Sequence, residues 1–211
     1  MDSFFDTSVV IHYASFSKLL EKPLAKKCYN YIKNKKGKFL LGYYIEGEIK
    51  RRIKNRRIMY QEVLNKIINS IYEFDKSSLF RSLNDRDKKT AKQIYELSKG
   101  KKPEQVKRNL SEDQTVFEMQ IETFLKFLID DRLVEEENIR KELLSIIKEY
   151  GCNHADCMVL TSAIQAQESL AIFYFVAADK HFNSNEYDFL KKDPRIIEMK
   201  FPKLKNLLYE D

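Results

Sequence analysis

Four acidic side chains follow apolar stretches of the chain: Asp6, Glu48, Asp156 and Asp179. The first lies in SFFDTSVVI, residues 3–11, among two phenylalanines and a run of β-branched residues. A carboxylate in such a segment has to be neutralised, hydrogen-bonded or bound to a cation, because burying a bare charge is very costly. Asp6 is therefore expected either to cap the following helix or to hold a metal ion.

The elements that would position these acids can be read from the apolar pattern. Residues 3–6, 39–44 (FLLGYY) and 170–176 (LAIFYFV) predict buried strands, and residues 196–199 predict a last short one. Apolar strands that alternate with helices are typical of a parallel sheet with both faces covered. The expected fold is α/β, three-layered and rich in helix, with a central parallel sheet of about four to five strands.

Apolar residues at helical spacing fill the segments between the strands. Leu19 and Leu20 begin one such series, and residues 45–72 predict one long helix. Residues of about 80–145 predict helices with no strand between them, one ended by Pro103 and the next begun by a capping box at Ser111. We interpret this region as a helical insertion within a single domain of residues 1–211.

Each of the four acids lies at or after the end of a predicted strand, or in the first turns of a predicted helix. Asp6 ends the first strand, Glu48 lies in the first turns of the helix after the second, Asp156 begins the helix HADCMVLTSAI, and Asp179 follows the strand LAIFYFV. Binding sites of open parallel sheets form beyond the carboxyl ends of the strands. Clustered carboxylates suit Mg²⁺ or Mn²⁺ and repel one another without a cation. Glu46 competes with Glu48 for the second position, which Glu48 fits better.

Each acid also has a simpler explanation when it is considered alone. Asp156 is a good candidate for a helix N-cap, Asp179 for a turn residue, and Glu48 for a solvated helix residue beside Lys50 and Arg51. The argument for a metal site therefore rests on the combination of the four.

The segments FFDTSVVI, FLLGYYIEGEIKR, NHADCMVLTSAI and FVAADKHFN together resemble the PIN-domain family of metal-dependent nucleases. The resemblance covers roughly residues 1–75 and 145–201. It implies a PIN-like fold in which Asp6, Glu48, Asp156 and Asp179 hold one or two Mg²⁺ or Mn²⁺ ions and are the catalytic residues.

The resemblance implies a metal-dependent endoribonuclease that hydrolyses phosphodiester bonds in single-stranded or structured RNA. A toxin-like role with an antitoxin or other protein partner, and assembly into a homodimer, stay open. The alternatives are a non-catalytic PIN-fold module that binds RNA or protein, and a nuclease directed at DNA or at particular structures.

Charge and composition limit the classes of partner. The net charge is +6, and basic residues gather in KNKKGK (33–38), KRRIKNRR (50–57) and KGKKPEQVKR (99–108). A single such run is usually a solvated face, but three favour a nucleic-acid partner. No stretch is apolar enough to span a membrane, and three scattered cysteines suit a reducing cytoplasm, so we expect a cytoplasmic protein without a membrane partner.

Other groups give weaker signals. Cys152, His154 and Cys157 lack an evident fourth zinc ligand, so a structural zinc site is not expected. His181 is expected to be a surface histidine, although it could approach a phosphate. Aromatic side chains near the strand ends could stack on unpaired bases, with core packing favoured for Tyr174 and both alternatives open for the others: Tyr43, Tyr44 and Phe182.

Overall fold

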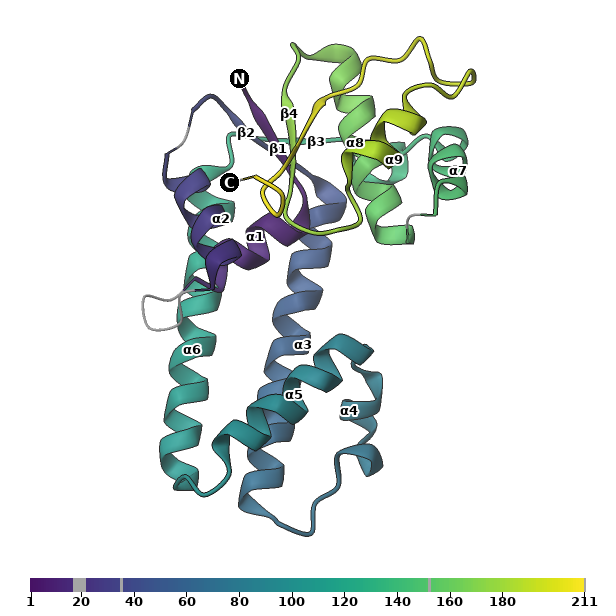
Figure 1. Ribbon diagram of the computed structural model, residues 1–211. Coiled ribbons are helices and arrows are strands. Elements are labelled where there is room, and N and C mark those ends of the chain that lie inside the picture. The colour runs from purple at the N-terminus through teal and green to yellow at the C-terminus, as the bar shows by residue number, and fades with distance from the viewer. Residues whose placement is uncertain (17–21, 35, 152, 211) are drawn as a thin grey trace. The chain divides into compact units, whose positions relative to one another are not determined.

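The computed structural model describes residues 1–16, 22–34, 36–151 and 153–210, so the predicted helix residues Leu19 and Leu20 and the zinc candidate Cys152 lie outside the described residues. Five strands form one all-parallel sheet in the order β3-β2-β1-β4-β5, which confirms the predicted α/β class (Figure 1). The strands are β1 (Ser3–Phe5), β2 (Phe39–Gly42), β3 (Asp131–Leu133), β4 (Tyr174–Ala177) and β5 (Lys203–Asn206).

The strand order places a change of direction at the centre of the sheet. After β1 the chain adds β2 and β3 on one side, and it then returns to add β4 and β5 on the other side of β1. In register, Phe5 of β1 lies beside Val176 of β4. The chain therefore leaves the carboxyl end of β1 toward β2 and the carboxyl end of β4 toward β5, which lie on opposite sides of β1 in the sheet. Parallel sheets bind ligands at a point where neighbouring strands diverge in this way.

Helices pack on both faces of the sheet because successive strand residues point to opposite faces. Phe5 meets Tyr31 of α2 edge-on, with ring centroids 6.1 Å apart. Phe4 points to the other face of the sheet. Its ring lies beside Gly42 there, and Ser162 of α8 lies beside Gly42 as well. The helices that belong to the sheet unit are α1 (Thr7–Ala14), α2 (Pro23–Lys33), α7 (Lys141–Glu149), α8 (His154–Ser169) and α9 (Ser184–Leu190).

Two edge strands differ from the predictions. Residues 196–199 form a turn, and the last strand is instead β5, while β3 lies inside the region expected to hold helices only. Their sequences, KLKN and DRL, lack an apolar run because an edge strand has one neighbour and is partly exposed. Pairing with β4 and β2 makes them strands, and pairing cannot be read from local sequence.

The chain forms two compact units, of which one comprises residues 1–49 and 120–211 and the other residues 50–119. The second unit contains most of α3 (Tyr43–Ile68) and of α6 (Pro103–Thr123), together with η1 (Phe74–Lys76), α4 (Ser78–Ser82) and α5 (Asp85–Ser98). It has its own apolar core, formed by Met59, Tyr60, Val63, Phe74, Phe80, Leu83 and Ala91. Its helices are thus held by burial of their own side chains.

The helix boundaries in the second unit correct one prediction. Pro103 begins α6 instead of ending the preceding helix, and α6 continues through Ser111, where a new helix was expected. Proline is well tolerated in the first turn, where its missing amide hydrogen would have no partner within the helix. The shorter elements of the sheet unit are η2 (Phe124–Leu128) and η3 (Glu136–Asn138). Among the described residues, no helix has the length and apolar character needed to cross a membrane.

Candidate metal centre

The loops after β1 and β4 bring Asp6 and Asp179 to the same edge of the sheet. The amide of Asp6 donates to the carbonyl of Val176 over 2.9 Å, so Asp6 follows β1 while still bonded to β4. Asp179 lies two residues beyond the end of β4, and the Asn206 side chain of β5 donates to its carbonyl oxygen over 2.6 Å. The charge of Asp179 acts on Asp6, which places the two carboxylates near each other.

Asp6 fills the first of the two roles that the sequence left open, the cap of the following helix. Its Oδ2 accepts a hydrogen bond from the Ser8 amide over 2.9 Å, which caps α1, and another from the Ser8 hydroxyl. The same hydroxyl accepts from the Ala178 amide over 2.9 Å. Ser8 thus fixes the Asp6 carboxylate and ties it to the backbone just before Asp179.

Glu48 is held beside Asp6 by the next residue along the chain. The Thr7 hydroxyl donates to Glu48 Oε2 over 2.7 Å, and both residues are buried. Glu46, its competitor in sequence, accepts instead from Arg132 of β3 over 2.8 Å. Arg132 also donates to the Leu125 carbonyl oxygen, so Glu46 helps to anchor β3 while Glu48 points to the carboxylates.

Asp156 lies in the first turn of α8, but it is not the N-cap that its sequence context favoured. Asn153 caps α8 by accepting from the Asp156 amide over 3.1 Å, and its own amide group donates to the Asp156 carboxylate. Asp156 Oδ2 also lies 2.9 Å from His181 Nδ1. The helix start therefore aims Asp156 at the loop that follows β4.

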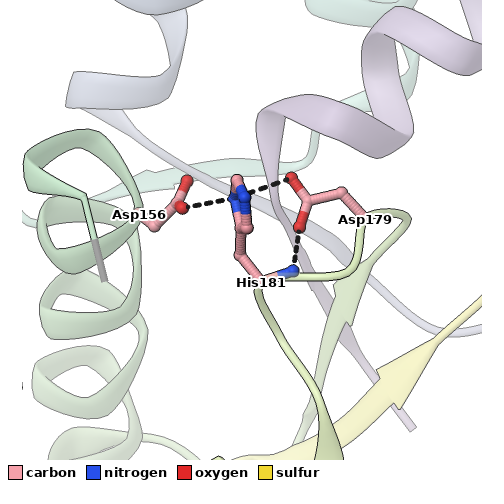
Figure 2. A group of neighbouring side chains, drawn as sticks. All are labelled: Asp156, Asp179 and His181. Carbon is pink, nitrogen blue, oxygen red and sulfur yellow. Dashed lines mark hydrogen bonds and ion pairs between the residues drawn. The ribbon is translucent and has the colours of Figure 1, made fainter. Parts of the chain in front are cut away.

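His181 lies between two of the acids. The sequence predicted only that it would be a surface histidine. Figure 2 shows its imidazole between Asp156 and Asp179, with Nδ1 3.8 Å from Asp179 Oδ2. Its backbone amide donates to Asp179 Oδ1 over 2.8 Å, which folds the loop back on itself. The sequence does contain a signal for this turn, because His181 lies two residues after Asp179. An aspartate side chain commonly accepts a hydrogen bond from the backbone amide two residues later.

Burial and mutual repulsion raise the pKa of two carboxyl groups in this centre. The pKa of Asp6 is raised to about 7, chiefly by burial and further by the charges of Asp179 and Asp156, although the Ser8 hydrogen bonds lower it. The pKa of Asp156 is raised to about 6 by burial and by the charges of Asp179 and Glu48, against the lowering effect of His181. The four acids thus form one electrostatically linked group.

A buried aspartate elsewhere in the sheet unit gives a useful contrast. Asp193 is 5% exposed and Asp6 is 3% exposed, but burial is the main influence on the pKa of Asp6 and only a minor one on that of Asp193. Arg195 donates to Asp193 through its side chain and backbone and holds the pKa of that carboxyl far below its usual range. The interactions that lower the pKa of Asp6 come from a hydroxyl and an amide instead of a cation.

The spacing of the ligand atoms fits a divalent ion. One ligand atom each from Asp156, Asp179 and His181 all lie within 4.8 Å of one another. Ligands of a single Mg²⁺ or Ca²⁺ ion lie about 2.0–2.6 Å from it, so two of them can be at most roughly 5 Å apart. Asp6 and Glu48 are not part of this three-residue group and are linked to it by charge: Asp179 and Asp156 act on Asp6, and Glu48 acts on Asp156. Their carboxylate oxygens are of the kind that such ions prefer.

The aromatic and cysteine candidates have simpler roles. Tyr44 and Phe182 are buried, and Phe182 packs edge-on against Phe175 with centroids 4.9 Å apart, so neither offers a stacking surface. Tyr43 is 45% exposed at the start of α3 and stays a candidate for stacking on a base. Cys157 is buried within α8.

Comparisons with models of known protein families, with curated proteins and with solved structures find no match for this chain. The assignment of a function therefore depends on the geometry of the centre and on the sequence motifs.

Proposed function

We propose that this chain is a metal-dependent endoribonuclease with a PIN-like site, in which Asp6, Glu48, Asp156 and Asp179 hold Mg²⁺ or Mn²⁺. The observation that carries the proposal is that buried, mutually repelling carboxylates lie where β1 and β4 diverge. No arginine or lysine of the described residues is among the main influences on the pKa of Asp6. A divalent cation would relieve this repulsion.

The residues of such a site would have different roles. Asp156 and Asp179, whose ligand atoms have the spacing that a single ion needs, would ligate the ion. Asp6 and Glu48, held by Ser8 and Thr7, would complete the ligand set. Ser8 keeps Asp6 in place through its two hydrogen bonds. A bound ion supplies an activated water and stabilises charge on the phosphate, so no side-chain nucleophile is needed.

RNA is favoured as the substrate because basic residues are concentrated in one unit. Residues 50–119 contain 18 lysines and arginines against 10 acidic residues, a net charge of +8. The whole chain carries 38 basic and 32 acidic residues, so the sheet unit has a net charge of −2. Such a division suits a protein that attracts a polyanion with one unit and binds a metal with the other.

The direct test is cleavage of labelled single-stranded RNA and DNA with and without Mn²⁺. We expect RNA cleavage that requires the ion and is lost in Asp6→Asn. Binding of RNA without cleavage by the wild-type protein would favour a non-catalytic module, and cleavage of DNA alone would favour a DNA-directed nuclease.

The turn between α5 and α6 is expected to contribute to RNA affinity through charge. Exposed Lys101 and Lys102 lie in this turn, and exposed Lys107 and Arg108 lie in the first two turns of α6. Replacing all four with glutamine should weaken RNA binding at least about 10-fold at 0.1 M salt and lower the slope of log Kd against log salt by about 3, since each phosphate contact on a single strand contributes about 0.7. Fluorescence anisotropy over a salt series measures both.

The matched control for this charge removal replaces four exposed lysines of the sheet unit with glutamine: Lys141, Lys148, Lys192 and Lys200. It should change the slope much less. An equal loss in the two variants would mean that RNA responds only to total charge and has no preferred surface.

His181 is expected to tune which ion is bound. His181→Asn should weaken Mn²⁺ binding by about 10-fold, because loss of a residue that ligates or orients a metal typically costs 10–100-fold. Mg²⁺ binding should change less, since Mg²⁺ prefers oxygen ligands. Calorimetric titration with each ion measures the two affinities, with His154→Asn as the control. Unchanged Mn²⁺ affinity in His181→Asn would remove the imidazole from the ligand set.

A further inference from the structure

A hollow of about 540 Å³ opens on the face of the sheet that α2 covers, away from the four acids. We name it the tyrosine–lysine hollow and define it by six of its lining residues: Ser3, Lys27, Tyr31, Tyr174, Lys205 and Glu210. Ser3 and Tyr174 begin β1 and β4 side by side, so the hollow lies toward the strand starts, whereas Asp6 and Asp179 follow the strand ends.

The lysines of the hollow are held in place by aromatic rings and by one acidic residue. Lys205 Nζ lies 5.5 Å from the ring centre of Tyr31 and 5.7 Å from that of Tyr174. It also forms an ion pair with Glu210 Oε2 at 2.8 Å, and its side chain is only 25% exposed. Lys27 of α2 donates to the backbone carbonyl oxygen of the same Glu210.

Glu210 thus presents two oxygens to two ammonium groups. The segment 207–210 that carries it makes a turn after β5, with the Tyr209 amide donating to the Asn206 carbonyl oxygen over 3.1 Å. A second hollow of about 500 Å³ is also lined by Glu210 and Tyr174, together with Lys191 and Lys203. Glu210 therefore lines both hollows, and lysines line each of them as well.

We propose that the tyrosine–lysine hollow binds the terminal phosphate of a nucleotide or of an RNA strand, and that Glu210 occupies the phosphate position when no ligand is bound. A terminal phosphate carries a charge of about −1.5 to −2 at pH 7 and three acceptor oxygens. It can satisfy Lys27 and Lys205 together better than one carboxylate oxygen and one carbonyl oxygen do. The Ser3 and Tyr31 hydroxyls are hydrogen-bonded to each other over 2.8 Å, so one of the two keeps a proton that it can donate to a ligand.

The remaining volume and the rings indicate the rest of the ligand. A phosphate fills only a small part of the hollow, and Tyr31 and Tyr174 line the space beside Lys205. Aromatic rings are common platforms for nucleobases and sugars in proteins that bind nucleic acid. A nucleoside attached to the phosphate would therefore find apolar contacts there, which inorganic phosphate lacks.

The experiment is calorimetric titration of the full chain in EDTA with 5′-AMP, adenosine and inorganic phosphate. EDTA excludes phosphate binding through a metal ion, so the result is independent of the proposed nuclease activity. We expect 5′-AMP to bind, phosphate to bind more weakly and adenosine more weakly still. Titration with 5′-phosphorylated and 5′-hydroxyl RNA of one sequence then distinguishes a strand end from a free nucleotide as the source of the phosphate.

Two variants with opposite expected effects make the assignment specific. Lys205→Gln should weaken 5′-AMP binding at least 10-fold, whereas Glu210→Gln should tighten it about 3–10-fold, because the internal competitor loses its charge. Lys200→Gln and Glu198→Gln, at exposed positions near β5, are the matched controls and should bind like wild type. Asp6→Asn should also bind 5′-AMP normally.

The tighter 5′-AMP binding expected for Glu210→Gln could not result from misfolding, whereas weaker binding by Lys205→Gln could. If neither wild type nor Glu210→Gln binds 5′-AMP or 5′-phosphorylated RNA, the assignment is overturned. Binding that is equal in Lys205→Gln and wild type would overturn it as well, since the ligand would then lie elsewhere.

Discussion

Asp6→Asn is expected to abolish ion-dependent cleavage and, in the same molecule, to stabilise the metal-free sheet unit at pH 8. Asparagine caps helices about as well as aspartate, so the bonds from the Ser8 amide and hydroxyl have an acceptor in the variant. What the substitution removes is a buried negative charge close to those of Asp156 and Asp179.

The sign of this stability change follows from the direction of the pKa shift. The pKa of Asp6 is about 7 in the folded chain, whereas an aspartate in water ordinarily has a pKa of 3.8, so the folded state binds this proton more tightly. The stability that Asp6 contributes is full below pH 4 and is lost as the pH rises through about 7. A shift of this size corresponds to roughly 4 kcal/mol, of which asparagine should recover about 2 because its amide is also buried.

A gain of about 2 kcal/mol corresponds to a rise of roughly 4–8 °C in melting temperature for a chain of this size. Differential scanning calorimetry in EDTA at pH 8 measures it, and the gain should vanish near pH 4. The control Asp188→Asn removes an exposed carboxylate paired with Lys191 and should leave both melting and cleavage unchanged. A destabilised Asp6→Asn at pH 8 would mean that the carboxylate is a structural cap only.

The comparison of Asp6 with Asp193 explains why this variant is informative. Both carboxyl groups are buried, but Asp193 has Arg195 as a partner and a lowered pKa. Removing the charge of Asp193 would weaken its bonds from Arg195, which would keep Glu149 as a partner, and should destabilise the fold modestly. Removing the charge of Asp6 relieves repulsion. Opposite stability effects at two aspartates with little exposed surface would distinguish a carboxylate that lacks a cationic partner from one that has one.

The sequence predicted those parts of the molecule whose residues carry a local signal. The apolar runs of β1, β2 and β4 predicted the centre of the sheet, and strand ends predicted that Asp6 and Asp179 would meet. The edge strands β3 and β5 were missed because pairing, not composition, makes KLKN and DRL extended. Strand limits also shifted: β4 begins at Tyr174, whereas the apolar run begins at Leu170.

Within the centre, what could not be predicted depends on side-chain direction. Glu46 and Glu48 lie on one helix two residues apart, and only the position of Arg132 on the unpredicted strand β3 explains why Glu46 is engaged elsewhere. His181 was expected to be a surface histidine, and its side chain is indeed 47% exposed. Its place beside two acids follows from the Asp179 side chain accepting its amide. Short-range spacing suggests such a turn, but tertiary contacts decide which way the ring points.

Affinity for Mn²⁺ is expected to rise steeply between pH 5.5 and pH 7.5. The ion competes with protons for Asp6 and Asp156, whose pKa values are raised to about 7 and about 6. Because ligands must be deprotonated to bind a metal, apparent affinity grows as each group loses its proton. Deprotonation of two groups with these pKa values, if their coupling is neglected, gives an increase on the order of 100-fold over this range, most of it from Asp6.

Calorimetry in several buffers measures this increase, and the enthalpy of buffer ionisation reports the protons released on binding. Near pH 6 more than one proton should leave with each ion, and near pH 8.5 almost none. Ser8→Ala should move the rise to higher pH, because it removes the hydroxyl that stabilises the Asp6 carboxylate. If affinity were the same at pH 5.5 and pH 7.5, the ion would bind to groups that are already ionised, and these two acids would not be its ligands.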